Sequence, residues 1–226
     1  MIPRLWPCPG SDGSASEEYA LAFDAGRPLR LLIVPALFDE ANRLRRLTVE
    51  VMRRLDRAGI DSFLPDLPGC NESTAPLDAQ SVESWQDAMA AAAAHFEASH
   101  CLGIRGGCLF MPTARPGWHY APVKGANLLR QMMRARILAS REAGREESQD
   151  TLLELGRAEG LVLSGHALGA EFISHFESLK PPVRANLQTI DQDMVGGSGL
   201  WLRAEPGESR EQADALAAIL AIGMRA

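Results

Sequence analysis

The stretch CLGIRGGCLF, residues 101–110, decides the fold of this chain. Its first residues are apolar and suit a strand that is buried on both faces. Gly103 and Gly107 flank Arg105, and Gly106 lies between them. A sharp turn from a strand into a helix needs such glycines, because the backbone passes too close to its neighbours for side chains. We therefore expect a tight strand–turn–helix unit centred on Arg105.

Strands and helices alternate before this turn. LRLLIV, residues 29–34, is an apolar run closed by Pro35 and predicts a buried strand. Residues 40–58 carry apolar side chains at helical spacing. The same analysis predicts a strand over 60–64, a helix over 81–99 and a strand over 101–104. Alternation of this kind predicts a three-layer α/β fold with a mostly parallel central sheet.

The flanking regions predict less regular structure. Residues 1–16 are rich in Pro, Gly and Ser, so we expect a loose N-terminal arm. Prolines interrupt the chain after residue 110, and about 112–160 are predicted to form a short helical, cap-like insertion. Further expected elements are an edge strand over 18–24, a helix over 126–140, a mobile connector over 140–150, a strand over 161–163, a helix over 171–179, a strand over 199–204 and a helix over 209–223. All of them are assigned to one domain, 1–226.

Length and composition restrict the function classes. The chain has 226 residues and 24.5 kDa, which suits one domain. Its formal net charge of −6 disfavours nucleic-acid binding, which needs a basic surface. The longest apolar run, Leu31 to Phe38, is too short to span a membrane, and the first residues lack the apolar core of a signal peptide. We expect a cytoplasmic protein with reduced thiols at Cys8, Cys70, Cys101 and Cys108.

The turn at Arg105 has the context of the nucleophile elbow of α/β-hydrolases, G-x-S-x-G. Arginine occupies the central position, where the nucleophile stands in those enzymes. A guanidinium stays protonated and offers no usable lone pair, so Arg105 cannot attack a carbonyl. The loops PALFDE and PDLPGCNES follow two earlier strands and correspond in place to the loops that surround such an elbow.

The order and spacing of these segments resemble the exosortase A system-associated hydrolase 2 family, a divergent α/β-hydrolase branch. The similar segments are LIVPALFDEANRLRR, PDLPGCNES, GIRGG, VKGANLLRQMMRARIL and LVLSGHALGAEFISHFESL, between about residues 29 and 180. That family also has arginine at the elbow, and it has tyrosine at the position of His166. The resemblance implies an α/β-hydrolase fold and a place in the exosortase and exopolysaccharide system.

The histidines do not complete a Ser-His-Asp triad. In this fold the chain order is nucleophile, acid, histidine, and the histidine follows the last strand. The last of the five histidines in this sequence is His175. We therefore predict a binding or accessory protein that is not a standard serine hydrolase. No Walker loop, dinucleotide fingerprint or metal-ligand motif occurs, so we expect no cofactor and no metal.

Two roles of Arg105 remain open. It can form an internal ion pair with Glu40, which lies at the same edge of the sheet. It can also bind a small carboxylate, acyl or phosphate-bearing ligand together with backbone N–H groups of the elbow. The corresponding pocket residues would be Arg105, Gly103, Gly106, Gly107, Glu40 and Asn42.

The alternative is a hydrolase or acyltransferase for esters or thioesters that uses Cys70 as nucleophile. Arg105 would supply the positive field that a thiolate requires, and His166 or His119 would act as base. A third possibility is a structural protein that binds a protein partner, or a second copy of itself, through the insertion.

Overall fold

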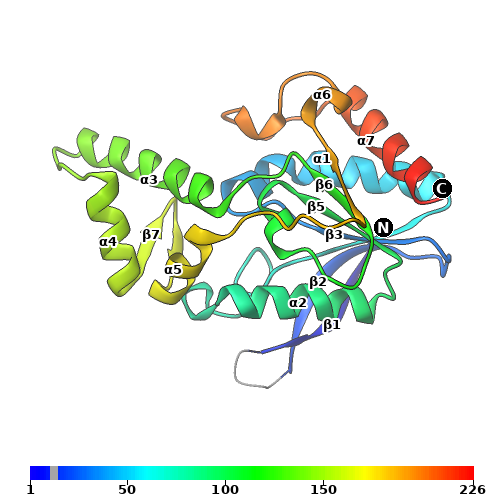
Figure 1. The fold of residues 1–226 in the computed structure, drawn as a ribbon, viewed down its shortest axis with the longest axis horizontal. Coiled ribbons are helices and arrows are strands. Elements are labelled where there is room, and N and C mark those ends of the chain that lie inside the picture. Colours follow the sequence, from blue (N-terminus) through cyan, green and yellow to red (C-terminus); the bar gives the residue numbers. More distant parts are fainter. Residues whose placement is uncertain (11–14) are drawn as a thin grey trace.

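The computed structural model describes residues 1–10 and 15–226, and its centre is a seven-stranded sheet in the order β1-β2-β4-β3-β5-β6-β9 (Figure 1). The strands β3 to β6 and β9 pair in parallel, whereas β2 pairs antiparallel with β1 and β4. Their bounds are β1 Ile2–Pro9, β2 Ala15–Phe23, β3 Arg30–Val34, β4 Asp61–Pro65, β5 His100–Ile104, β6 Gly117–Tyr120 and β9 Leu187–Ile190. The predicted mostly parallel sheet is confirmed.

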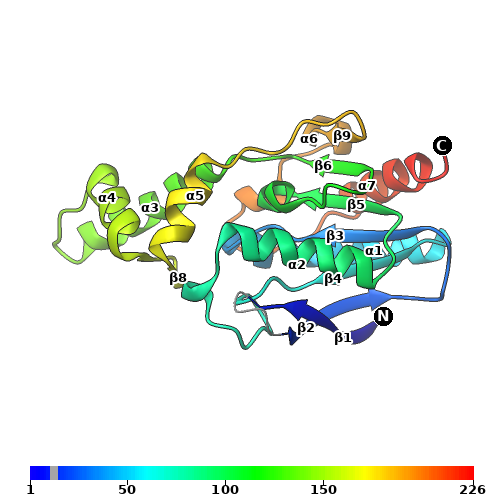
Figure 2. The ribbon, with the colours of Figure 1, turned by 60° about the horizontal axis from the view of Figure 1, so that its bottom comes forward.

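Helices cover both faces of this sheet. Helices α1 (Asp39–Arg57) and α7 (Arg210–Gly223) pack on one face, and α2 (Val82–His95) packs on the other (Figures 1 and 2). Helix α1 buries Leu44, Leu47, Val51 and Leu55, the apolar stripe that predicted it. Ser81 caps α2: its side chain accepts from the backbone N–H of Ser84, and the Ser84 side chain accepts from the backbone N–H of Ser81. The three-layer arrangement is thereby confirmed.

The N-terminal residues are not a loose arm. Residues 2–9 form β1 at the edge of the sheet, and Trp6 and Cys8 are fully buried. Prolines stand at positions 3, 7 and 9, where an edge strand tolerates the missing N–H. The part of the predicted arm at residues 11–14 lies outside the described residues.

The insertion begins later and ends later than predicted. Residues 117–120, expected within it, form strand β6, whose Trp118 and Tyr120 are buried in the core. The insertion contains α3 (Gly125–Glu142), α4 (Gln149–Glu159), β7 (Leu161–Leu163), β8 (His166–Leu168) and α5 (Ala170–Ser178). It extends beyond the carboxyl ends of the parallel strands (Figures 1 and 2). The connector expected over 140–150 is therefore shorter, because helices occupy both of its ends.

The last part of the chain also differs from the prediction. Residues 199–204 do not form a strand, and Leu200–Leu202 form the short helix η3. The strand of this region is β9, which is followed by α6 (Gln192–Val195). The other short helices are η1 (Leu77–Ala79) and η2 (Arg105–Phe110). Among the described residues, no helix combines the length and the apolar character that crossing a membrane requires.

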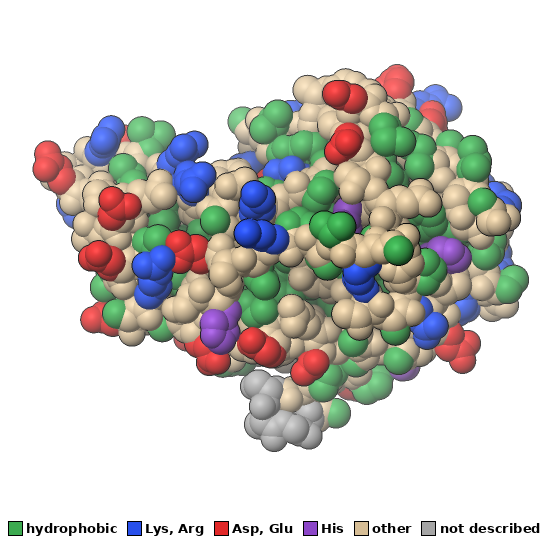
Figure 3. Space-filling view, viewed as in Figure 1, with side chains coloured by type: hydrophobic (Ala, Val, Ile, Leu, Met, Phe, Trp, Pro, Cys, Tyr) green, Lys and Arg blue, Asp and Glu red, His purple; other side chains and the backbone are tan. Residues whose placement is uncertain are grey.

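On the face drawn in Figure 3, a notch separates the insertion from the main body. Lys and Arg side chains lie along the insertion's side of it. The exposed side of α3 contributes Arg130, Arg134 and Arg141 to the basic surface of the insertion.

Candidate functional site

The turn after β5 has the strained geometry of an elbow. Arg105 has a φ of 52°, which a residue with a side chain adopts only when its surroundings impose it. A Cβ atom on Gly107 would lie 2.3 Å from the carbonyl oxygen of Pro35, and one on Gly103 would lie 2.8 Å from Cα of Cys108. The glycines therefore permit the close approach that brings Arg105 to the carboxyl edge of the sheet.

The Arg105 side chain lies against the protein itself. Its Nε and Nη2 donate to the two carboxylate oxygens of Glu40, at 3.0 and 2.9 Å. Its Nη1 donates to the carbonyl oxygen of Ala121 at 2.9 Å, and its guanidinium carbon lies 4.2 Å from the ring centre of Trp201. The Glu40 side chain is 2% exposed and that of Arg105 12%. The predicted internal pair is confirmed.

This pairing limits what the elbow can do. A bidentate arginine–carboxylate pair fixes both side chains and cancels their charges. An anionic ligand at Arg105 would compete with a carboxylate that is already in place. The elbow therefore presents a closed, nearly neutral surface to the space above the sheet.

A separate small cavity of about 90 Å³ opens at the same edge of the sheet. It lies between the loop after β3, the loop after β4 and the β8 strand of the insertion. Its wall is mainly apolar and includes three groups that can make polar contacts, Cys70, Asn71 and His166. The other lining residues are Pro35, Ala36, Leu37, Phe38, Ala41, Leu67 and Gly69. The structure thus brings Cys70 and His166 to one cavity.

The surroundings of Cys70 oppose a thiolate. The pKa of its thiol is raised from 9.0 to about 12, mainly by burial and in smaller part by the carboxylates of Asp66 and Glu18. Those two carboxyl groups are themselves buried, and burial raises the pKa of each of them. The field at Cys70 is therefore the reverse of the positive field expected from Arg105.

His166 forms part of the cavity wall beside the loop after β3. Its Nε2 lies 3.6 Å from Oδ1 of Asp39, and its ring meets the ring of Phe38 edge-on at 5.3 Å between centres. His119 is elsewhere, buried in β6, where desolvation lowers its pKa. The two histidines therefore differ: His166 has access to the cavity, and His119 belongs to the sheet.

None of the six predicted pocket residues lines this cavity, and several of the residues that do line it were not predicted. Asn42 lies on the exposed side of α1, in a shallow hollow with Arg45, Arg46 and Pro206, away from the cavity. Phe38 and Asn71 of the cavity have φ values of 54° and 52°, and neither carries a sequence signal such as glycine. Trp201 packs on Arg105 although the two residues lie almost a hundred positions apart in the sequence.

No protein-family model matches the chain, and no curated protein matches it. Among solved structures, the complex of DcsB with its substrate analogue aligns with a TM-score of 0.58 and 10% identity over 100% of both chains. Alpha/beta hydrolase domain-containing protein 10 from mouse aligns with a TM-score of 0.56 and 13% identity, over 83% of this chain and 77% of that one. A putative hydrolase from Agrobacterium vitis S4 aligns with a TM-score of 0.47 and 13% identity, over 62% of this chain and only 60% of that one.

These likenesses concern the fold, because the identities are low. The first two, together with the sheet order and the sharp turn after β5, show that the chain has an α/β-hydrolase fold.

Proposed function

We propose that this protein uses an α/β-hydrolase fold for binding and does not hydrolyse esters at its elbow. The observation that carries the proposal is the bidentate contact between Arg105 and Glu40. The elbow residue has no nucleophilic atom, and its side chain is held by a buried carboxylate and a backbone carbonyl. The sequence also has no histidine after His175, where the base of a triad would stand.

The ligand that we propose is a small carboxylate, acyl or phosphate-bearing molecule at the carboxyl edge of the sheet. The cavity beside the elbow fits a short chain or one small group, since its volume is about 90 Å³. Its apolar wall favours an acyl group, and Asn71 and His166 offer hydrogen-bonding atoms at its rim. By resemblance, this binding serves an accessory role in the exosortase and exopolysaccharide system, in the cytoplasm.

The alternative function, an acyl transfer by Cys70, has one observation in its favour. Cys70 and His166 line the same cavity, which is the pairing that a cysteine nucleophile needs. The raised pKa of Cys70 opposes it. Both functions can be tested together.

The test is turnover of a panel of short and medium acyl esters and thioesters by the wild type, Cys70→Ala and Arg105→Ala. We expect no turnover above background in any of them, with at least one carboxylate, acyl or phosphate compound raising the melting temperature of the wild type. Turnover that Cys70→Ala abolishes would contradict the proposal and identify a cysteine enzyme.

The accessory role needs a test in cells. Deleting the gene should lower exopolysaccharide output, and the Cys70→Ala variant should restore it. Unchanged output after deletion would contradict the accessory role.

A further inference from the structure

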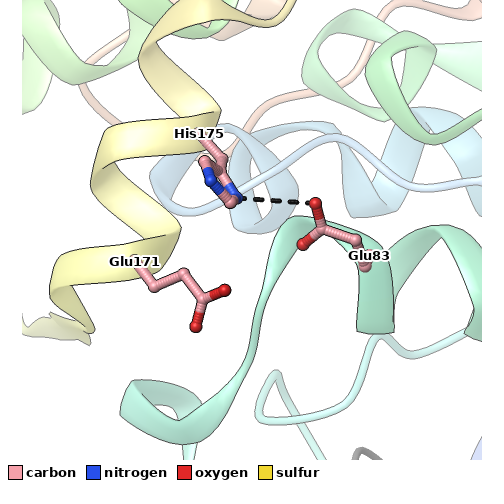
Figure 4. Close-up of side chains that lie close together, drawn as sticks. All are labelled: Glu83, Glu171 and His175. Atoms are coloured by element: carbon pink, nitrogen blue, oxygen red, sulfur yellow. Dashed lines mark ion pairs between the residues drawn. The ribbon is translucent and has the colours of Figure 1, made fainter.

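Three side chains that can bind a metal ion meet where the insertion contacts the main body. Glu83 stands in the first turn of α2, and Glu171 and His175 stand one turn apart on α5 (Figure 4). One ligand atom from each residue lies within 4.8 Å of the other two. Because Glu83 and Glu171 are 88 positions apart in the sequence, no local motif contains the whole cluster.

The distances suit a transition metal. Nδ1 of His175 lies 3.4 Å from Oε1 of Glu83. Two ligand atoms of a tetrahedral zinc ion, each bound at about 2.0–2.1 Å, lie about 3.4 Å apart. Glu171 and His175 are four residues apart, so both side chains project from one face of α5, and a carboxylate oxygen of Glu171 lies within 4.8 Å of the ligand atoms of the other two residues.

No lysine or arginine of the described residues balances the charges of the cluster. Within the described part of the chain, neither Glu83 nor Glu171 forms an ion pair with a lysine or an arginine. By contrast, Glu177 on the same helix α5 forms an ion pair with Arg157, which neutralises its carboxylate. Two carboxylates and one imidazole are a donor set for zinc with three protein ligands, and water would complete the tetrahedron.

We propose that Glu83, Glu171 and His175 bind one divalent transition-metal ion, with Zn²⁺ as the representative ion. The ion connects α5 of the insertion to α2 of the main body. The site is distinct from the elbow and from the cavity beside it, and its occupation holds the insertion in place above them.

The test is calorimetric titration of Zn²⁺ into the chelator-treated full chain, with the wild type beside His175→Ala and Glu171→Gln. We expect one saturable site in the wild type and binding weakened by about tenfold or more in each variant. His95→Ala is the matched control, because it removes an exposed histidine from the far end of α2, and it should bind like the wild type. Circular dichroism checks that each variant is folded.

A second readout is the melting temperature. Zn²⁺ should raise the melting temperature of the wild type and of His95→Ala, because a ligand that binds only the folded state stabilises it. The melting temperature of His175→Ala should stay unchanged. The absence of saturable binding to the wild type, or equal affinity in His175→Ala, would overturn the proposal.

Discussion

Two regions at the carboxyl edge of the same sheet differ in how their polar groups are satisfied. At the elbow, Arg105 is held by Glu40, by a backbone carbonyl and by the face of Trp201. In the cavity beside it, Cys70, Asn71 and His166 line one small open space. The elbow, where a hydrolase of this fold has its nucleophile, is thus the closed region, and its neighbour is the one with room for a ligand.

The two regions therefore differ in role although they share one edge of the sheet. At the elbow, the close glycine contacts and the positive φ of Arg105 hold β5 against the loop after β3. The Arg105 side chain is itself part of this packing, since Glu40 and Ala121 hold its guanidinium. We therefore expect changes at the elbow to act on stability and changes in the cavity to act on binding.

Outside the Arg105–Glu40 ion pair, the largest effect is expected for Gly107→Ala. The new methyl group would lie 2.3 Å from the carbonyl oxygen of Pro35 and 2.4 Å from that of Val34, and neither backbone atom can move freely. We expect a loss of about 3 kcal/mol or more in the free energy of unfolding, measured by urea denaturation.

Gly106→Ala is the matched control in the same turn. Its methyl group would meet side-chain atoms of Leu37 and Leu128 at 2.7–2.8 Å, and because side chains shift at a lower cost than backbone, a loss of only about 1–2 kcal/mol is expected. Equal losses in the two variants would mean that the tight backbone contact does not define the elbow.

Alkylation of Cys70 tests the field in the cavity. At pH 8 we expect iodoacetamide to modify Cys70 at least about 100-fold more slowly in the folded protein than in urea, read by site-resolved mass spectrometry. Folding raises the pKa of Cys70 from 9.0 to about 12, so the folded protein holds the thiol proton more tightly than the unfolded chain does. The free energy of unfolding gained in this way is fully present below pH 9 and is lost as the pH rises towards 12.

Arg105→Ala should leave this alkylation rate unchanged. Rapid alkylation near pH 7 that becomes slower in Arg105→Ala would contradict the separation of the two regions, because it would show that Arg105 activates the thiol.

The smallest effect on stability is expected for His166→Ala. The side chain is 29% exposed, and its contact with Asp39 spans 3.6 Å, so the free energy of unfolding should change by less than about 1 kcal/mol. The same variant should reduce the melting-temperature shift caused by whichever compound stabilises the wild type. A loss of unfolding free energy as large as that of Gly107→Ala would contradict this expectation, because it would show that the cavity wall contributes as much to stability as the elbow.

The sequence predicted the part of the fold that local patterns encode. The helical stripe of α1, the cap at Ser81 and the glycines around Arg105 each act within a few residues. The pairing of Arg105 with Glu40 was also predictable, since parallel strands β3 and β5 are neighbours and both residues follow their ends.

The remaining features depend on contacts between distant segments. Strand β1 was missed because its prolines are typical of loops, and its pairing with β2 and the burial of Trp6 and Cys8 are contacts with distant segments. Strand β9 has exposed polar residues at its centre, so its sequence lacks the apolar signal of LWLRA, which forms no strand. His166 reaches the cavity through a hairpin of the insertion, a placement that no local pattern shows.

The most direct test of the closed elbow is a double-mutant cycle on Arg105 and Glu40, with unfolding free energies for Arg105→Leu, Glu40→Leu and the double variant. Each single variant leaves one buried charge without its partner and should cost about 3–5 kcal/mol. The double variant should be more stable than the sum of the two losses predicts, by about 2 kcal/mol or more. Losses that add to within about 0.5 kcal/mol would contradict the account, because they would show that the ion pair does not hold the elbow.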